Sequence, residues 1–379
     1  MALWVLLILL VNGVVSFAYT AANSTEPSTV WAMLATTFIY FLGISQTGIV
    51  FSAVMRIAKS GWGRYFSRLG EILTLSFIPV AFVTFLIIYF GGTDHLFYWA
   101  HPEKMEHGHH LSPWLSRDQF LWRGLISMAL FYAMSYMYFA TGRAEEEGRA
   151  SYDVEKRLNV MAALVMFFYV LTNTNTAWDF GMMIIPHWES SIFPPYYWAG
   201  NLLGGSAFLF IMSNFFIQRG PVESFNKRCL DSMGKVMLGF VLLWTYMHWS
   251  QHIVIWYSNL PNLVGPIAKR MSGNFTLPFV LMLLTIFVLP FFALLFRPIK
   301  LSFKTLFVVA ALICTGVWIN RYLMVIPVFS DGTKLVFLSW TGISLILSGL
   351  AATVLSVIFF LKLFPRVTVT THDGEGGHH

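Results

Sequence analysis

Cysteine is nearly absent from this chain, which limits the redox chemistry that the chain can carry by itself. Its 379 residues contain only two cysteines, Cys229 and Cys314. Cys229 falls in a charged loop and Cys314 inside an apolar stretch, so we expect no disulfide between them. The sequence has no Cys-x-x-Cys-His motif, no cysteine cluster and no Walker or dinucleotide fingerprint. We therefore expect no covalently bound redox centre and no metal site on this chain.

Charged residues are also scarce, and their scarcity excludes an ordinary soluble domain. Only 11% of the residues are charged, whereas 57% are hydrophobic and 17% are aromatic. A helix needs ~20 apolar residues to cross a bilayer core. Ten stretches are long enough: 2–20, 28–56, 70–91, 119–140, 158–180, 194–217, 233–257, 275–296, 305–328 and 336–362. We predict an all-α integral membrane protein with about ten transmembrane helices.

The uneven distribution of lysine and arginine predicts how these helices are oriented. Seventeen of these residues flank the apolar stretches on one side, and only five lie on the other side. Lys and Arg accumulate in the cytoplasmic loops of membrane proteins. Both termini are therefore expected in the cytoplasm. The net charge of +6 then reflects membrane anchoring and indicates no nucleic-acid partner.

The chain is expected to form one membrane domain with short ends. Residues 1–27 hold the first transmembrane helix, which resembles a signal segment but lacks a positive n-region. An uncleaved helix is favoured there. Residues 28–363 form the polytopic domain, and residues 364–379 form a polar cytoplasmic tail. The largest outer loop contains five histidines: His95, His101, His107, His109 and His110. The irregular spacing of these histidines favours a solvated loop over a metal site.

Ionisable side chains crowd toward the outer end of the predicted membrane domain. Such groups are costly at membrane depth unless they face a cavity or a partner. Residues 240–261 form one apolar helix with several of them near one end, and other helices supply the rest at a similar depth. Nine residues are candidates for a polar site at this level: Arg123, Asp179, His187, Glu189, His248, Gln251, His252, Tyr257 and Arg321.

Two interpretations of this site stay open. In the structural one, Arg321 pairs with Asp179 or Glu189 and pins helices together. In the functional one, the site hydrogen-bonds a quinol head group and accepts its protons, which requires an apolar slot and a few proton acceptors. For the site as a whole we favour function. Haem b is not favoured, because His248 and His252 lie on one helix face rather than on two facing helices.

The opposite side of the membrane holds fewer candidates. Glu71, Asp231 and Lys235 lie near predicted helix ends, where snorkelling or pairing explains them, and they are candidates for inner-side proton transfer. Polar runs at mid-depth occupy residues 45–47 and 172–175. These runs either bridge helices or support a water chain, and the sequence leaves both possibilities open.

Three segments resemble the NrfD-type (PsrC/NrfD-like) membrane subunits of alternative complex III. They are NTAWDFGMMIIPHWESSIF at 175–193, LLWTYMHWSQHIVIWYSNLP at 242–261 and WINRYLMVIPVF at 318–329. The length favours the smaller of the two paralogous subunits, the ActF type. The resemblance implies two four-helix bundles of NrfD type plus peripheral helices. It matches the family motif at Asp179, His187, Ser250, Gln251, Tyr257 and Arg321, whereas Glu189, His248 and His252 depart from it.

The resemblance also implies a function and a setting. The chain would be a membrane subunit of a quinol:cytochrome c oxidoreductase in a bacterial inner membrane, not catalytic alone, that contributes to quinol binding, proton translocation or both. Quinone or menaquinone would be its ligand. Implied partners are a larger NrfD-type subunit, an iron–sulfur subunit with its clusters, multihaem and monohaem cytochrome c subunits with haem c, small membrane subunits, and lipid. Alternatives are the quinone-binding anchor of another NrfD-type reductase, a structural scaffold subunit and an ion-coupled transporter.

Overall fold

The computed structural model of this chain describes residues 2–101, 112–146, 152–216, 227–333 and 335–364. These residues form helices joined by short connections, and no β-strand occurs among them. Eight segments are long and apolar enough to cross a membrane. The predicted all-α, multi-pass membrane protein is thereby confirmed, and eight of the expected crossings are found.

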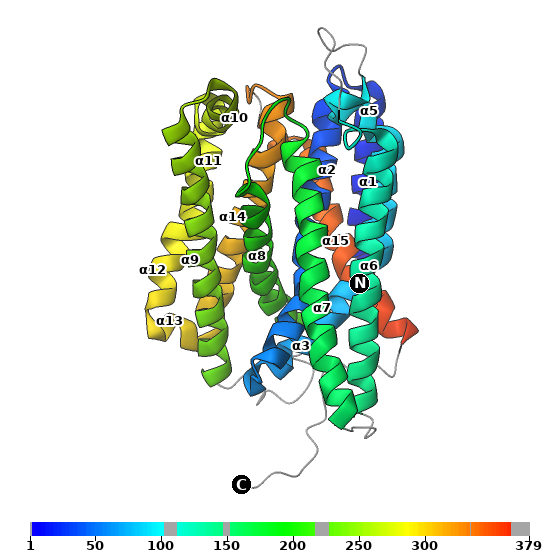
Figure 1. Cartoon of the computed structure of the whole chain (residues 1–379), viewed down its shortest axis with the longest axis vertical. Coiled ribbons are helices and arrows are strands. Elements are labelled where there is room, and N and C mark those ends of the chain that lie inside the picture. Colours follow the sequence, from blue (N-terminus) through cyan, green and yellow to red (C-terminus); the bar gives the residue numbers. More distant parts are fainter. Residues whose placement is uncertain (1, 102–111, 147–151, 217–226, 334, 365–379) are drawn as a thin grey trace.

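The long helices stand side by side, as Figure 1 shows, with α5 and α10 at one end of the molecule and α13 at the other. We call these two ends the α10 end and the α13 end. Five of the eight membrane segments are single helices: α1 (Ala2–Asn23), α2 (Pro27–Ile57), α6 (Arg117–Glu146), α14 (Phe303–Phe329) and α15 (Trp340–Leu363). The other three are composite. One consists of α3 (Arg64–Ser76), α4 (Ile78–Ile87), η2 (Ile88–Gly92) and α5 (Thr93–Leu96); one of α7 (Tyr152–Ala177) and η5 (Trp178–Met182); and one of α11 (Thr276–Leu283), η8 (Leu284–Val288) and α12 (Leu289–Leu295).

Two more long helices, α8 (Phe193–Phe216) and α9 (Lys227–Ser258), run alongside these segments. Helix α9 carries the predicted site residues His248, Gln251 and His252. The short helices α10 (Pro261–Met271) and α13 (Arg297–Leu301) cap the two ends of the same group. The described residues contain three π-helical turns in membrane segments: η2 and η8 lie within their segments, and η5 ends its segment. Such turns are rare and often mark functional positions.

The helix contacts form two closed rings, and helices of the first ring contact helices of the second. Helix α2 contacts α3 and α7, and α6 contacts α3 and α7, which closes the first ring. Helix α8 contacts α9 and α14, and α12 contacts α9 and α14, which closes the second. Helix α2 also contacts α8 and α14, and 94% of its membrane window is buried. The polar residues of α2 therefore face protein rather than lipid.

Helix α1 lies outside both rings and packs on α15 and α2. Small and polar side chains hold it there. Asn12 Nδ2 donates to Ser344 Oγ at 2.9 Å, and the hydroxyl groups of Thr20 and Thr341 lie 2.8 Å apart. Only 11% of the membrane window of α1 is buried, so most of its apolar surface is available to lipid. The sequence predicts a first transmembrane helix in residues 1–27, and α1 occupies residues Ala2–Asn23 of that range.

Two glycines let α2 and α3 touch through their backbones. A Cβ atom on Gly48 would lie 2.3 Å from the Gly70 carbonyl oxygen, and a Cβ on Gly70 would lie 2.3 Å from the Gly48 carbonyl oxygen. Neither backbone can move away cheaply, because α2 is packed on all sides. Glycine at both positions is therefore required for this close approach, as in other tight contacts between membrane helices.

We expect Gly70→Ala to lower the free energy of unfolding by about 1–3 kcal/mol, because the added methyl overpacks this crossing. Thermal unfolding of the purified protein in detergent measures the effect. Gly239→Ala on α9 is the control, since no atom lies within 4 Å of its added methyl. Equal stability of the two variants would contradict the close-packing role of Gly70.

Candidate functional site

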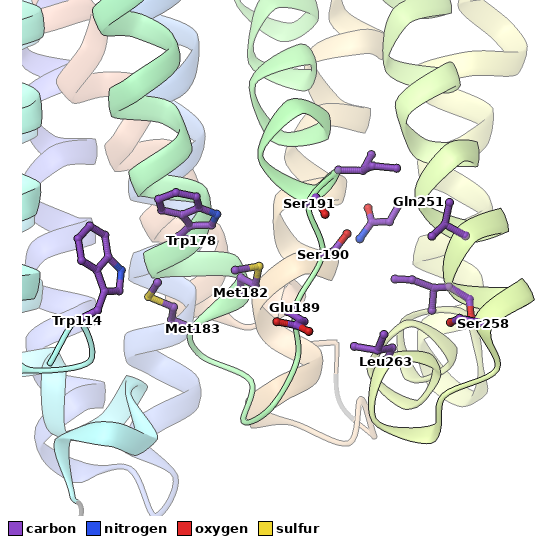
Figure 2. Close-up of a pocket in the computed structure, with 13 residues that line it drawn as sticks. Trp114, Trp178, Met182, Met183, Glu189, Ser190, Ser191, Gln251, Ser258 and Leu263 are labelled. Carbon is purple, nitrogen blue, oxygen red and sulfur yellow. The ribbon is translucent and has the colours of Figure 1, made fainter. Parts of the chain in front are cut away.

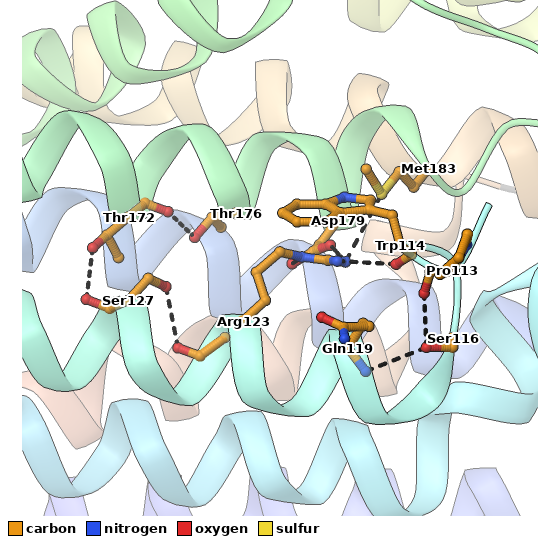
Figure 3. A network of polar contacts seen from close by, with 11 residues as sticks. Pro113, Trp114, Ser116, Gln119, Arg123, Ser127, Thr172, Thr176, Asp179 and Met183 are labelled. Atoms are coloured by element: carbon orange, nitrogen blue, oxygen red, sulfur yellow. Dashed lines mark hydrogen bonds and ion pairs between the residues drawn. The ribbon is translucent and has the colours of Figure 1, made fainter.

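Asp179 lies in the π-helical turn η5 and forms a buried ion pair with Arg123 of α6 (Figure 3). Arg123 Nη2 donates to Asp179 Oδ1, and Arg123 Nε lies 3.4 Å from Asp179 Oδ2. Arg123 also donates to the Trp114 carbonyl oxygen at 3.0 Å, and its guanidinium lies 4.3 Å from the centre of the Trp114 ring. The pair therefore ties α6, α7 and the connection before α6 together at the α10 end.

The structural interpretation in which Arg321 pairs with Asp179 or Glu189 is wrong. Asp179 is engaged by Arg123, and no carboxylate within the described residues contacts Arg321. The side chain of Arg321 is nevertheless completely buried. The sequence could not show which arginine Asp179 would meet, because Arg123 and Arg321 were both placed at a similar depth.

Neutral acceptors surround the Arg321 guanidinium instead. Its Nη2 donates to the Tyr197 carbonyl oxygen at 2.7 Å and to Asn201 Oδ1 at 2.8 Å, and its Nη1 donates to Asn320 Oδ1 at 3.0 Å. The guanidinium also lies 4.1 Å from the centre of the Tyr197 ring. Gly200 leaves space for it, since a Cβ there would lie 2.7 Å from Nη2. Arg321 is thus a buried cation that has no counter-charge among the residues that the structure describes.

One line of amides leads from Arg321 into the first ring. Asn201 Nδ2 donates to Asn173 Oδ1 at 2.8 Å, and Asn173 Nδ2 donates to Gln46 Oε1 at 2.9 Å. The line crosses from α8 through α7 to α2, where Gln46 Nε2 is buried and has no partner. The polar runs at 45–47 and 172–175 therefore bridge helices, as one of the two interpretations predicted.

A second line leads from Arg321 toward α9. Asn320 Nδ2 donates to the Tyr196 hydroxyl, which lies 3.4 Å from His248 Nδ1. His248 stacks on the Trp244 ring with centroids 4.9 Å apart. His252 Nδ1 donates to the His248 carbonyl oxygen at 2.7 Å, and His252 Nε2 takes no part in this hydrogen bond. The predicted neighbours His248, His252 and Arg321 are thus brought together in the second ring.

A cavity of about 800 Å³ opens at the α10 end between the two rings (Figure 2). Gln251 of α9 points into it from one side and Trp114 and Trp178 border the other side. Gln251 is buried, and its Nε2 has no hydrogen-bond partner. The remaining lining residues are mostly apolar: Met182, Met183, Glu189, Ser190, Ser191, Ile192, Val254, Ile255, Ser258 and Leu263.

The other sequence candidates at this end have different positions. Glu189 is exposed and lines the large cavity, and the exposed His187 adopts a left-handed backbone conformation with φ of 56°. Tyr257 is 85% exposed and takes no part in the site. Of the histidine-rich loop, His107, His109 and His110 fall outside the described residues, whereas His101 lies 3.7 Å from Asp94.

The inner-side candidates form two separate pairs toward the α13 end. Glu71 accepts from Arg68 Nη1 at 3.0 Å and from Ser52 Oγ at 2.6 Å. Asp231 lies 2.6 Å from Lys235 Nζ, and this hydrogen bond keeps the pKa of Asp231 below its usual value. Neither pair lines the large cavity. Pairing therefore accounts for all three residues.

Sequence reasoning missed Arg270, Tyr196 and Asn320. Arg270 was assigned to an outer loop, but α10 folds back so that its side chain is buried against Trp188 and Phe193. The signal for Asn320 was its position beside Arg321 in an otherwise apolar helix. Tyr196 did not stand out in the sequence, because it lies among other aromatic residues, which are common at membrane boundaries.

No protein-family model matches this chain, and no curated protein matches it either. Its function is therefore inferred from the geometry of the site.

We expect Asp179→Asn to lower the free energy of unfolding by about 3–5 kcal/mol, because it leaves the Arg123 charge buried without compensation. Thermal unfolding in detergent measures this loss. Arg117→Gln is the matched control, since its ion pair with Asp94 is about half exposed (48% and 46%) and worth less than ~1 kcal/mol. The double variant Arg123→Met/Asp179→Leu should recover most of the stability.

Proposed function

We propose that this chain is a membrane subunit of an alternative complex III-like quinol:electron-acceptor oxidoreductase, and that the large cavity receives the quinol head group. The observation that carries the proposal is the cavity itself. It measures about 800 Å³, is lined mostly by apolar side chains, and has the unpartnered Gln251 amide in its wall. Cavities that bind small organic molecules have this size and this mixture of apolar walls and few polar groups.

The polar groups suit a ligand that carries two hydroxyl groups on an aromatic ring. The Trp114 and Trp178 rings and the Met182 and Met183 thioethers offer flat or polarisable contacts for the ring. Glu189 and Gln251 project into the cavity from different elements, and their oxygen atoms can accept hydrogen bonds from hydroxyl groups.

Proton transfer from such a ligand would proceed toward the second ring. Gln251 borders both the large cavity and a smaller one that contains His248 and Tyr196. An imidazole can accept and release a proton, and His248 Nδ1 lies 3.4 Å from the Tyr196 hydroxyl on this side of Gln251. The Asp179–Arg123 pair, by contrast, acts in this proposal as a positioning element that holds the turn before the 183–192 connection in place.

The finer architecture belongs to the same proposal. The two rings of helices would be the two four-helix bundles of NrfD type, with α8 and α9 as the ninth and tenth crossings and α1 and α15 at the periphery. The α13 end would face the cytoplasm together with both termini, and the α10 end would face the outside of a bacterial inner membrane. Redox cofactors, namely haem c and iron–sulfur clusters, would be carried by partner subunits docked on these ends.

Photolabelling of native membranes with an azido-quinone tests ligand binding. We expect labelled peptides from residues 178–192 and 251–263, which border the large cavity. Gln251→Leu should reduce labelling about tenfold, because it removes a buried hydrogen-bonding group from the wall. Tyr257→Phe on the same helix is the control, since that side chain is 85% exposed and outside the cavity. Labelling elsewhere on the chain, or labelling unchanged in Gln251→Leu, would contradict the proposed site.

Gentle purification through an affinity tag on this chain tests the assignment to a complex. The expected product contains an iron–sulfur subunit, a second, larger NrfD-type protein and a haem c absorption spectrum. Recovery of this chain alone and colourless from mildly solubilised membranes would argue against a respiratory subunit and in favour of an ion-coupled transporter.

A further inference from the structure

A second, much smaller cavity lies behind Gln251, on the side away from the large one. It measures about 20 Å³ and is bordered by helices α8, α9, α10, α11 and α14. This volume accommodates one water molecule or one ion of similar size. Its polar lining consists of Tyr196, His248, Gln251, His252, Arg270 and Asn320.

Arg270 is the most under-satisfied cation in this lining. A guanidinium has five N–H donors, yet the one hydrogen bond of Arg270 runs from Nη2 to the Met324 carbonyl oxygen at 3.5 Å. Its other neighbours are the Trp188 and Phe193 rings, with centroids at 5.1 and 5.9 Å. Burial lowers the pKa of Arg270 to about 10, so the group remains charged at neutral pH.

No carboxylate within the described residues compensates this charge. Arg270 is 9% exposed, whereas its neighbour Lys269 is exposed and lies 3.5 Å from Asp331. A buried charge without a partner is costly in a membrane protein. The aromatic rings offset part of this cost, because their faces attract cations. They supply no acceptor for its N–H donors, and among the described residues only the Met324 carbonyl oxygen does.

Gln251 adds a second donor to the same space. Its side chain is 1% exposed, lines the small cavity, and its Nε2 has no acceptor. Arg270, which is charged, and Gln251, which is neutral, thus border the same small space, and each has N–H donors without an acceptor among the described residues. Such an arrangement requires an acceptor, and the uncompensated charge of Arg270 favours an acceptor that is negative.

We propose that the small cavity binds one monoatomic anion, a halide, held by Arg270 and Gln251. The volume excludes phosphate, sulfate or a carboxylate-bearing metabolite, all of which need space for several heavy atoms. The site does not depend on quinol binding, since no ligand in the large cavity is needed to form it. The halide neutralises Arg270 and fills the donor set, so its release is expected to destabilise the second ring.

Thermal unfolding of the purified full chain in sodium chloride, sodium bromide and sodium gluconate at equal ionic strength tests the site. We expect a saturable rise in Tm with chloride and bromide but not with gluconate, because an ion that binds only the folded state stabilises it. Arg270→Gln should weaken the halide midpoint at least about tenfold. Lys269→Gln, next to it on α10, is the matched control and should leave the midpoint unchanged.

Equal Tm values in the three salts would overturn the proposal, and so would an unchanged midpoint in Arg270→Gln or a weakened midpoint in Lys269→Gln. If Arg270→Gln does not fold, Gln251→Leu replaces it, with the same expected direction. Anomalous scattering from bromide-soaked crystals of the unaltered protein gives a direct result. A bromide peak between Arg270 and Gln251 supports the site, and water alone in the cavity overturns it.

Discussion

The structure depends on satisfying buried polar groups without help from bulk water. Inside a bilayer each unsatisfied group costs several kcal/mol, so polar side chains must meet one another. Arg321 is the most demanding of these groups, because it is charged and completely buried. Its bonds to Tyr197, Asn201 and Asn320 come from α8 and α14, and the amide line continues to α2. These bonds fix the position of the two rings of helices relative to each other around the Arg321 guanidinium.

The site combines two kinds of environment that are kept apart by a single side chain. On one side of Gln251 is a large, mostly apolar space next to Trp178, Met182 and Met183. On the other side is a much smaller space that two histidines and Arg270 border. An amide can donate and accept, so this residue can connect a ligand in the first space to the proton-accepting groups of the second. Neither environment would provide this connection without the other.

The class of protein could be predicted from the sequence, but not every side-chain pairing within the site could. Hydropathy alone gave the helical membrane segments, because a 20-residue apolar run has few alternative structures. Helical periodicity could also have excluded Tyr257, which is nine residues from His248 and therefore on the opposite face of α9. The pairing of Asp179 with Arg123 could not be foreseen, since it depends on how α6 and α7 rotate about their axes. The inward turn of Arg270 depends on α10 folding back, which no local pattern in the sequence records.

The central position of α2 has a consequence for biogenesis. This helix leaves the ribosome well before its final neighbours α7, α8 and α14, which follow it in the chain. Until they arrive, Ser45, Gln46 and Thr47 face lipid or an insertion factor rather than the amides and hydroxyl groups that surround them in the finished protein. A chain interrupted before α7 would leave the polar side chains of α2 without the partners that Asn173 of α7 and Asn201 of α8 supply, and quality-control proteases in the membrane could recognise it as incomplete.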